Sequence, residues 1–240
     1  MIKNFKLQFA FFWVGQDILI PQALVDSIRY VYGDEAYIYQ LSDNKTATMN
    51  NVDEVLRDEL PNDIMLARLR AYSLVVTKNT TIFLDADSLV INKLKLTEFD
   101  IYRAFLVKRD DQTSIINHNY PEYYPEFVNQ KIIDIMPILF GLIITPDGGE
   151  LFNGLFEIAL KLPERFHRWY GDQMAIAEEY KKNKEKYLLL PQKEYLFITR
   201  NSFNRDELAD LIKSGVKIIT FKGPYSKEFI PRTLKELLGE

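Results

Sequence analysis

Residues 81–90 read TIFLDADSLV, an apolar run that ends abruptly in two carboxylates, Asp85 and Asp87. The apolar residues 82–84 do not alternate with polar ones, which predicts a strand covered on both faces, as in a parallel sheet. Because residues i and i+2 of a strand point to the same face, the two carboxylates are expected side by side at the strand's end. Ligands of open α/β sheets bind beyond the carboxyl ends of the strands, so this pair marks a candidate site.

Two neighbouring carboxylates repel each other, and one of them tends to take up a proton unless a cation lies between them. An all-oxygen pair suits a hard divalent ion, so Asp85 and Asp87 are candidate ligands for Mg²⁺ or Mn²⁺. Such an ion would in turn hold a phosphate-bearing ligand. The alternative is a simple turn in which one of the two aspartates caps the next segment.

Composition limits the classes to which the chain can belong. Its 240 residues are enough for a single domain over residues 1–240 with a sizeable core. The absence of cysteine excludes disulfides, thiolate metal sites and cysteine nucleophiles, and it fits a cytoplasmic location. The net charge of −4 gives no sign of a nucleic-acid partner. The apolar run at residues 7–14 is too short to span a bilayer, so no transmembrane segment is expected, and peripheral attachment to the inner membrane face is left open.

Strand-like and helix-like stretches alternate along the chain, which predicts an α/β fold with a mainly parallel mixed sheet flanked by helices. Strands are expected over residues 9–14, 36–41, 81–84, 100–107, 134–145 and 217–220. Helices are expected over residues 23–32, 52–60, 62–76, 150–160, 173–181 and 231–238. The Pro- and Tyr-rich residues 118–128 are expected to form a loop.

A second candidate element of the site is the segment 169–174, which reads WYGDQM. Gly171 breaks the chain and a helical pattern follows, so Asp172 is well placed to act as the N-cap of that helix. The functional interpretation places Asp172 and Gln173 at the mouth of the site, where they would bind sugar hydroxyls. Both roles are compatible with each other.

Basic residues near two of these elements are candidates for holding an anion. Lys222 and Lys227 surround a tight turn at Gly223, where the backbone can approach a diphosphate closely and the lysines add positive charge. On the helix expected at residues 62–76, Arg68 and Arg70 are about 200° apart, so at most one of them is expected to face the site. Arginine pairs well with phosphate oxygens.

Two chemistries commonly use a carboxylate pair of this kind. In haloacid-dehalogenase phosphatases the first aspartate attacks phosphate, but there the motif usually ends the first strand, whereas here 80 residues precede the motif's strand. In sugar-nucleotide transferases the carboxylates hold a metal–diphosphate. A nucleotide-binding half that precedes the motif favours the transferase.

The order of these motifs resembles that of GT-A-fold glycosyltransferases, close in pattern to the glycogenin and bacterial lipopolysaccharide galactosyltransferase group. The corresponding fragments are Ala67-Arg68-Leu69, Leu84-Asp85-Ala86-Asp87, Phe140-Gly141, Asp172-Gln173 and Thr220-Phe221-Lys222-Gly223-Pro224. They extend over most of the chain, roughly residues 8–228. Each motif alone is weak, and their order and spacing carry the resemblance.

The resemblance implies a single GT-A-like domain that transfers a sugar from a UDP-sugar, with Mn²⁺ or Mg²⁺, and with retention of anomeric configuration. Its N-terminal half would bind the nucleotide, and its C-terminal half would face a glycan, lipid-linked or protein acceptor. Independently of the resemblance, the tyrosines of residues 117–127 suggest a loop that shapes the acceptor site, with a packed surface loop as the alternative. Asp85 and Asp87 would be the metal ligands, and Asp172 and Gln173 would orient the sugar. The donor would be bound by Arg68, Asp85, Ala86, Asp87, Lys222, Gly223 and Lys227.

The sequence departs from the family pattern in its last motif. Thr220 stands where the family usually places a histidine that ligates the metal, and Lys227 comes one residue late. Water or a neighbouring oxygen would then complete the coordination. A catalytically degenerate protein that binds a sugar nucleotide is therefore kept as the alternative to an enzyme, and a phosphatase as a third option.

Overall fold

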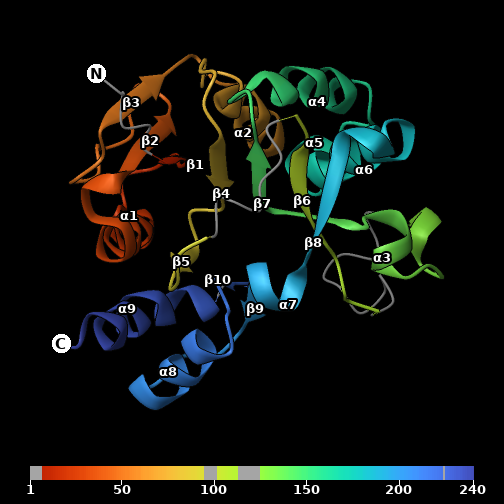
Figure 1. The fold of residues 1–240 in the computed structure, drawn as a ribbon. Helices are drawn as coiled ribbons and strands as arrows, with labels where there is room; N and C mark the ends of the chain where they lie inside the picture. Colours follow the sequence, from red (N-terminus) through yellow and green to blue (C-terminus); the bar gives the residue numbers. More distant parts are fainter. Residues whose placement is uncertain (1–6, 95–101, 113–124, 224) are drawn as a thin grey trace.

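The computed structural model describes residues 7–94, 102–112, 125–223 and 225–240. In Figure 1 a large mixed sheet crosses the molecule, and a small sheet lies beside it near the C-terminal helices. The large sheet contains β1 (Leu7–Phe12), β2 (Ala36–Ser42), β3 (Glu54–Arg57), β4 (Thr81–Leu84), β6 (Ala104–Lys108), β7 (Ile138–Thr145) and β8 (Tyr187–Pro191). The small sheet contains β5 (Ser88–Val90), β9 (Phe197–Thr199) and β10 (Ile218–Phe221).

The order of strands in the large sheet, β3-β2-β1-β4-β7-β6-β8, places a reversal of the chain's course between β1 and β4. From β1 the chain moves outward to β2 and β3, and it then returns to the other side of β1 as β4. Strand β7 is antiparallel to both of its neighbours, β4 and β6. The carboxyl ends of β1, β4 and β6 therefore meet at one edge, which is where open α/β sheets bind ligands.

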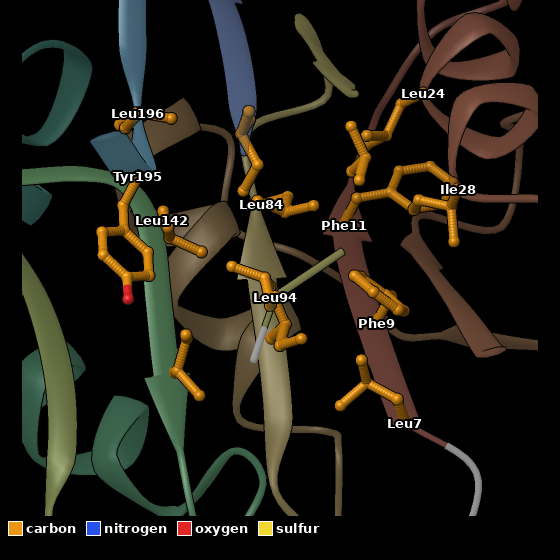
Figure 2. Close-up of a cluster of buried hydrophobic side chains, with 14 of the residues drawn as sticks. Leu7, Phe9, Phe11, Leu24, Ile28, Leu84, Leu94, Leu142, Tyr195 and Leu196 are labelled. Atoms are coloured by element: carbon orange, nitrogen blue, oxygen red, sulfur yellow. The ribbon is translucent and has the colours of Figure 1, made fainter. Parts of the chain in front are cut away.

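Helices cover both faces of the large sheet because its strands present apolar side chains on both sides. On one face, Phe9 and Phe11 of β1 lie against Leu24 and Ile28 of helix α1 (Leu19–Tyr32), as Figure 2 shows. The alternate residues of the same strand point the other way, toward three further helices. These helices are α2 (Ile64–Tyr72), α4 (Glu150–Leu160) and α6 (Gly171–Lys182).

The small sheet brings the last strand of the chain back to the acidic motif. Strand β5 begins directly after Asp87 and pairs antiparallel with β10, with Ser88 opposite Thr220. Its core is shared with α1 and with two C-terminal helices, α8 (Arg205–Lys213) and α9 (Ile230–Leu238). The turn that follows β10 therefore lies next to the turn that follows β4.

The remaining short elements connect these layers. They are α3 (Ile132–Ile135), α5 (Arg165–Arg168) and α7 (Gln192–Tyr195), with 3-10 turns at η1 (Gly33–Glu35), η5 (Pro125–Phe127), η6 (Lys184–Lys186) and η7 (Ser226–Phe229). Within the described ranges, no helix combines the length and the apolar character that crossing a bilayer requires.

The expected α/β class and the mainly parallel mixed sheet are confirmed, and the helix expected over residues 150–160 has those bounds. The helix expected over residues 52–60 is wrong, because residues 54–57 form β3 instead. They pair in parallel with β2, with Tyr39 opposite Glu54, and this pairing outweighs a weak local helical pattern. The loop expected at residues 118–128 falls largely outside the described residues; of it, residues 125–127 form η5.

Candidate functional site

The acidic motif forms the link between the two sheets. Strand β4 ends at Leu84, and Asp85 to Asp87 turn the chain into β5. Both ends of this link are held by backbone hydrogen bonds. The Asp85 N–H donates to the carbonyl of Gly141 on β7 at 3.1 Å, and the Asp87 carbonyl accepts from the Phe221 N–H at 3.0 Å. The two acids are thereby fixed at the carboxyl edge, beside the reversal between β1 and β4.

The two carboxylates converge on a single ammonium group. The Lys222 Nζ lies 2.5 Å from Asp85 Oδ2 and 3.4 Å from Asp87 Oδ1. A second ammonium, that of Lys227, lies 3.1 Å from Asp87 Oδ2. The expectation that Asp85 and Asp87 lie side by side is confirmed in this sense, although they stand in a turn rather than on a strand.

One arginine of helix α2 joins the cluster, as the helical spacing predicts. Arg68 Nη1 lies 2.5 Å from Asp85 Oδ1, and its Nη2 pairs with Asp172 Oδ2. The Arg68 guanidinium also stacks over the Phe140 ring of β7, 4.7 Å from the centroid, which adds a cation–π contact. Arg70 points elsewhere and pairs with Asp58 at 2.8 Å.

These charges hold one another in their ionised forms. Burial favours the neutral acid at Asp85, but the charges of Lys222 and Arg68 and the hydrogen bond from Lys222 outweigh it and lower the pKa of Asp85 below its usual range. Burial likewise favours the neutral amine at Lys222, and the charges of Asp85 and Asp87 outweigh it and raise the pKa of Lys222. The cluster is an ionised network with the two lysine side chains at its solvent side, each 37% exposed.

Asp172 has a different local role from the helix cap that the sequence suggested. Helix α6 begins two residues after Trp169, at Gly171, and its N-cap is Tyr170, whose φ of 67° is in the left-handed region. Asp172 lies inside the first turn and is fully buried. Its Oδ1 accepts from the Gln173 N–H at 2.7 Å, and its Oδ2 meets the Arg68 guanidinium. The capping interpretation is therefore wrong, and Asp172 holds Arg68 in place.

Gln173 is bound by a residue that the sequence analysis missed. Its Oε1 accepts a hydrogen bond from the Arg109 Nη2, while Arg109 Nε donates to the Met136 carbonyl at 2.7 Å. Burial lowers the pKa of Arg109 to about 10, so its guanidinium remains charged at neutral pH. The sequence held one clue to the role of Arg109, because this residue directly follows β6. The carboxyl end of β6 lies at the same edge of the sheet as that of β4.

Three small residues shape the cluster without contributing polar side chains. Gly141 faces Asp85, and a Cβ atom on it would come within 3.1 Å of Asp85 Oδ2. Gly223 follows Lys222 with a φ of 102°, which only glycine adopts readily. Ala86 lies between the two acids in the turn, and its side chain is buried in the core. The predicted donor-binding roles of Ala86 and Gly223 stay predictions.

The donors around the two acids do not suit the expected Mn²⁺ or Mg²⁺ well. Mg²⁺ requires oxygen ligands at about 2.0–2.1 Å in near-octahedral geometry. Thr220 offers a neutral hydroxyl, 3.5 Å from Asp87 Oδ1, and that carboxylate oxygen is also contacted by Lys222. Among the described residues, no group of three or more His, Cys, Asp or Glu side chains could hold a metal ion. Metal binding by Asp85 and Asp87 stays a prediction.

Comparison with solved structures identifies the fold. The galactosyltransferase LgtC in complex with donor and acceptor sugar analogs matches with a TM-score of 0.57 and 14% identity, over 97% of this chain and 95% of that one. An active-site mutant of LgtC matches with a TM-score of 0.58 and 13% identity over the same shares. A glycosyltransferase involved in the glycosylation of the major capsid of PBCV-1 matches at 0.58 and 10% identity, over 95% and 98%.

These similarities extend over nearly the whole of each chain, so the protein has the GT-A fold of these transferases. No protein-family model and no curated protein matches the sequence.

Proposed function

We propose that the protein is a glycosyltransferase that moves a sugar from a nucleotide diphosphate donor, a UDP-sugar, to a hydroxyl group of an acceptor. The observation that carries this proposal is the ionised cluster at the carboxyl edge, where Arg68, Lys222 and Lys227 meet Asp85 and Asp87. Exposed ammonium groups at the switch point of a sheet are suited to a diphosphate. The shared fold with sugar transferases supports the same function.

In the proposed reaction the bond between the anomeric carbon and the β-phosphate oxygen breaks, and its electron pair leaves with the diphosphate. The acceptor hydroxyl oxygen forms the new bond to the anomeric carbon, and its proton passes to the departing phosphate. Lys222 and Lys227 stabilise the negative charge that grows on the leaving group. Retention of configuration, by attack on the face from which the diphosphate departs, is part of the proposal and is supported by the sequence resemblance.

The other residues of the site would act as binding and positioning groups. Asp172 is buried and engaged by Arg68, so we propose that it acts through that arginine rather than on the sugar itself. Arg68 in turn would hold Asp85 and face the diphosphate. Arg109 donates a hydrogen bond to the Gln173 Oε1. The amide nitrogen of Gln173 is then the group that would donate a hydrogen bond to a sugar hydroxyl. The N-terminal half and the C-terminal motif would both contact the donor.

The alternatives receive less support. In a haloacid-dehalogenase phosphatase the motif ends the first strand, whereas here three strands of the described chain precede β4. An attacking aspartate also needs an oxygen that points at the phosphate, and both oxygens of Asp85 face cations of this chain, Oδ1 Arg68 and Oδ2 Lys222. A degenerate binding protein would keep the cluster without turnover, and the experiment below separates it from an enzyme.

The test is turnover and binding across a panel of UDP- and GDP-sugars, with release of the nucleotide diphosphate as the readout and calorimetry with UDP as the binding measurement. We expect release of UDP from at least one UDP-sugar, and a loss of about 10²–10³-fold in kcat for Lys227→Ala, because one charge donor to the leaving group is removed. Binding of UDP without turnover of any donor would support the degenerate alternative. Absence of both binding and turnover would overturn the proposal.

A further inference from the structure

Lys222 occupies the position between the two carboxylates of the acidic turn. Its ammonium lies between the carboxylates of Asp85 and Asp87, 2.5 Å and 3.4 Å from one oxygen of each. This is the place that a divalent ion bridging the same pair would need. An ammonium and a metal ion would compete for this one position, because two cations in contact with the same two oxygens repel each other.

The other two oxygens of the pair are also engaged. Asp85 Oδ1 is 2.5 Å from Arg68, and Asp87 Oδ2 is 3.1 Å from Lys227. Each of the four carboxylate oxygens thus faces a side-chain cation of this chain. A metal ion between the two acids would have to displace Lys222, and Thr220 would add only a neutral hydroxyl, which lies 3.5 Å from Asp87 Oδ1.

The charges of the cluster balance without a metal. In the described part of the chain the ion pairs join three carboxylates, of Asp85, Asp87 and Asp172, to three cations, of Arg68, Lys222 and Lys227. Removal of any one cation would leave three carboxylates facing two cations, so that one largely buried negative charge would be uncompensated, which is costly.

Lys222 is also held in this position by its backbone. Its N–H donates to the Thr199 carbonyl on β9 at 3.1 Å, and the preceding Phe221 N–H donates to the Asp87 carbonyl at 3.0 Å. The positive φ of Gly223 then turns the chain away immediately. The side chain is 37% exposed, and an ammonium group has three N–H donors, of which the two carboxylates take two. The third can be directed at a diphosphate oxygen.

We propose that the Lys222 ammonium replaces the divalent ion between Asp85 and Asp87, so that this chain handles its diphosphate donor without a metal. The proposal rests on the function proposed above. Lys222 then binds the β-phosphate and neutralises the charge that develops when the diphosphate departs. It is a catalytic residue in this account, whereas Asp85 and Asp87 are positioning residues that hold its ammonium.

The first test uses the wild-type protein. Electron paramagnetic resonance of a Mn²⁺ solution should show the full signal of the free ion in the presence of protein, and calorimetry with UDP should give the same affinity in EDTA as in Mn²⁺. Turnover of the UDP-sugar should change by less than twofold on adding EDTA. Uptake of Mn²⁺ that Asp87→Asn abolishes, or loss of turnover in EDTA, would overturn the inference while leaving the transferase function intact. Absence of UDP binding and of turnover under every condition would instead overturn the proposed function, and with it this inference.

The second test exchanges the cation. In Thr220→His with Lys222→Ala, the ammonium is removed and an imidazole is placed beside Asp87, so this double variant should take up Mn²⁺ and quench the signal of the free ion. Lys222→Ala alone should lose about 10²–10³-fold in kcat in EDTA. Lys186→Ala, an exposed lysine in η6, is the matched control and should behave as wild type. A Lys222→Ala variant that keeps its circular dichroism spectrum and wild-type turnover in EDTA would contradict the proposal.

Discussion

At the scale of single residues, the site depends on close contacts between charges rather than on exposed polar groups. Arg68 connects Asp85 in the acidic turn to the fully buried Asp172 on α6, and Phe140 supports its guanidinium from β7. Gly141 lies so close to Asp85 that the Cβ atom of any other residue there would press on its carboxylate. Both kinds of contact couple the site to the core.

The pairing of Arg68 with Asp172 gives a stability prediction. Arg68→Met should lower the free energy of unfolding by about 3–5 kcal/mol, because it leaves the buried Asp172 carboxylate without its cation. Adding Asp172→Asn to Arg68→Met should recover part of that loss. The measurement is a double-mutant cycle by urea denaturation, with an expected coupling of about 0.5–3 kcal/mol. Additive effects of the two substitutions would show that the pair does not couple.

At the scale of elements, the start of helix α6 decides where Asp172 and Gln173 lie. Tyr170 caps the helix with a positive φ, and the aromatic side chains of Trp169 and Tyr170 meet edge to face at 5.8 Å. A Cβ atom on Gly171 would overlap the backbone carbonyl of Phe166 at α5. Helices α5 and α6 can therefore approach this closely only because residue 171 is glycine.

Gly171→Ala should destabilise the protein by about 1–3 kcal/mol, since neither backbone can yield cheaply. It should also lower turnover by displacing Gln173. Gly154→Ala on α4 is the matched control, because a Cβ atom there meets nothing within 4 Å. Because that site is exposed and helical, Gly154→Ala should instead raise the free energy of unfolding by about 0.5–1 kcal/mol, since alanine has the higher helix propensity. Thermal and urea unfolding measure both effects, and equal behaviour of the two variants would refute the steric argument.

At the scale of the whole molecule, the ionised cluster joins the two sheets and links stability to pH. The pKa of Asp85 is lower in the folded protein than the value of about 3.9 expected in the unfolded chain. A lowered pKa contributes stability that is fully present above the unfolded value and is lost as the pH falls toward the folded one. Acid should therefore weaken the connection between the sheets.

We expect the free energy of unfolding of the wild type to fall as the pH is lowered from 5 to 3. The free energy of unfolding of Asp85→Asn should fall less steeply over the same range. The difference in slope should approach about 1.4 kcal/mol per pH unit, the value for one proton. Urea denaturation across this range measures it, and Gly154→Ala, which changes no titratable group, should keep the wild-type slope. Parallel curves for the wild type and Asp85→Asn would contradict the assignment of this charge to the network.

The local sequence pattern was sufficient to predict those parts of the fold that depend on neighbouring residues along the chain. The buried strand at residues 81–84, the helix at 150–160 and the order of the motifs could be predicted because periodicity and breaks in it reflect burial directly. The 100° step of a helix predicted that at most one of Arg68 and Arg70 would face the site, and the choice of Arg68 came from the family resemblance. The pairing of residues 54–57 with β2 could not be predicted, since a short edge strand takes its structure from its partner.

The chemistry between the motifs required the folded chain. Lys222 is 135 residues from Asp87 in sequence, and only the antiparallel pairing of β5 with β10 places its ammonium between the two acids. Arg109 reaches Gln173 for a similar reason, because β6 ends at the same edge as β4. The sequence contained the charged groups and the strands that carry them. Which charge faces which is a matter of strand order and register, and contacts between distant segments set both.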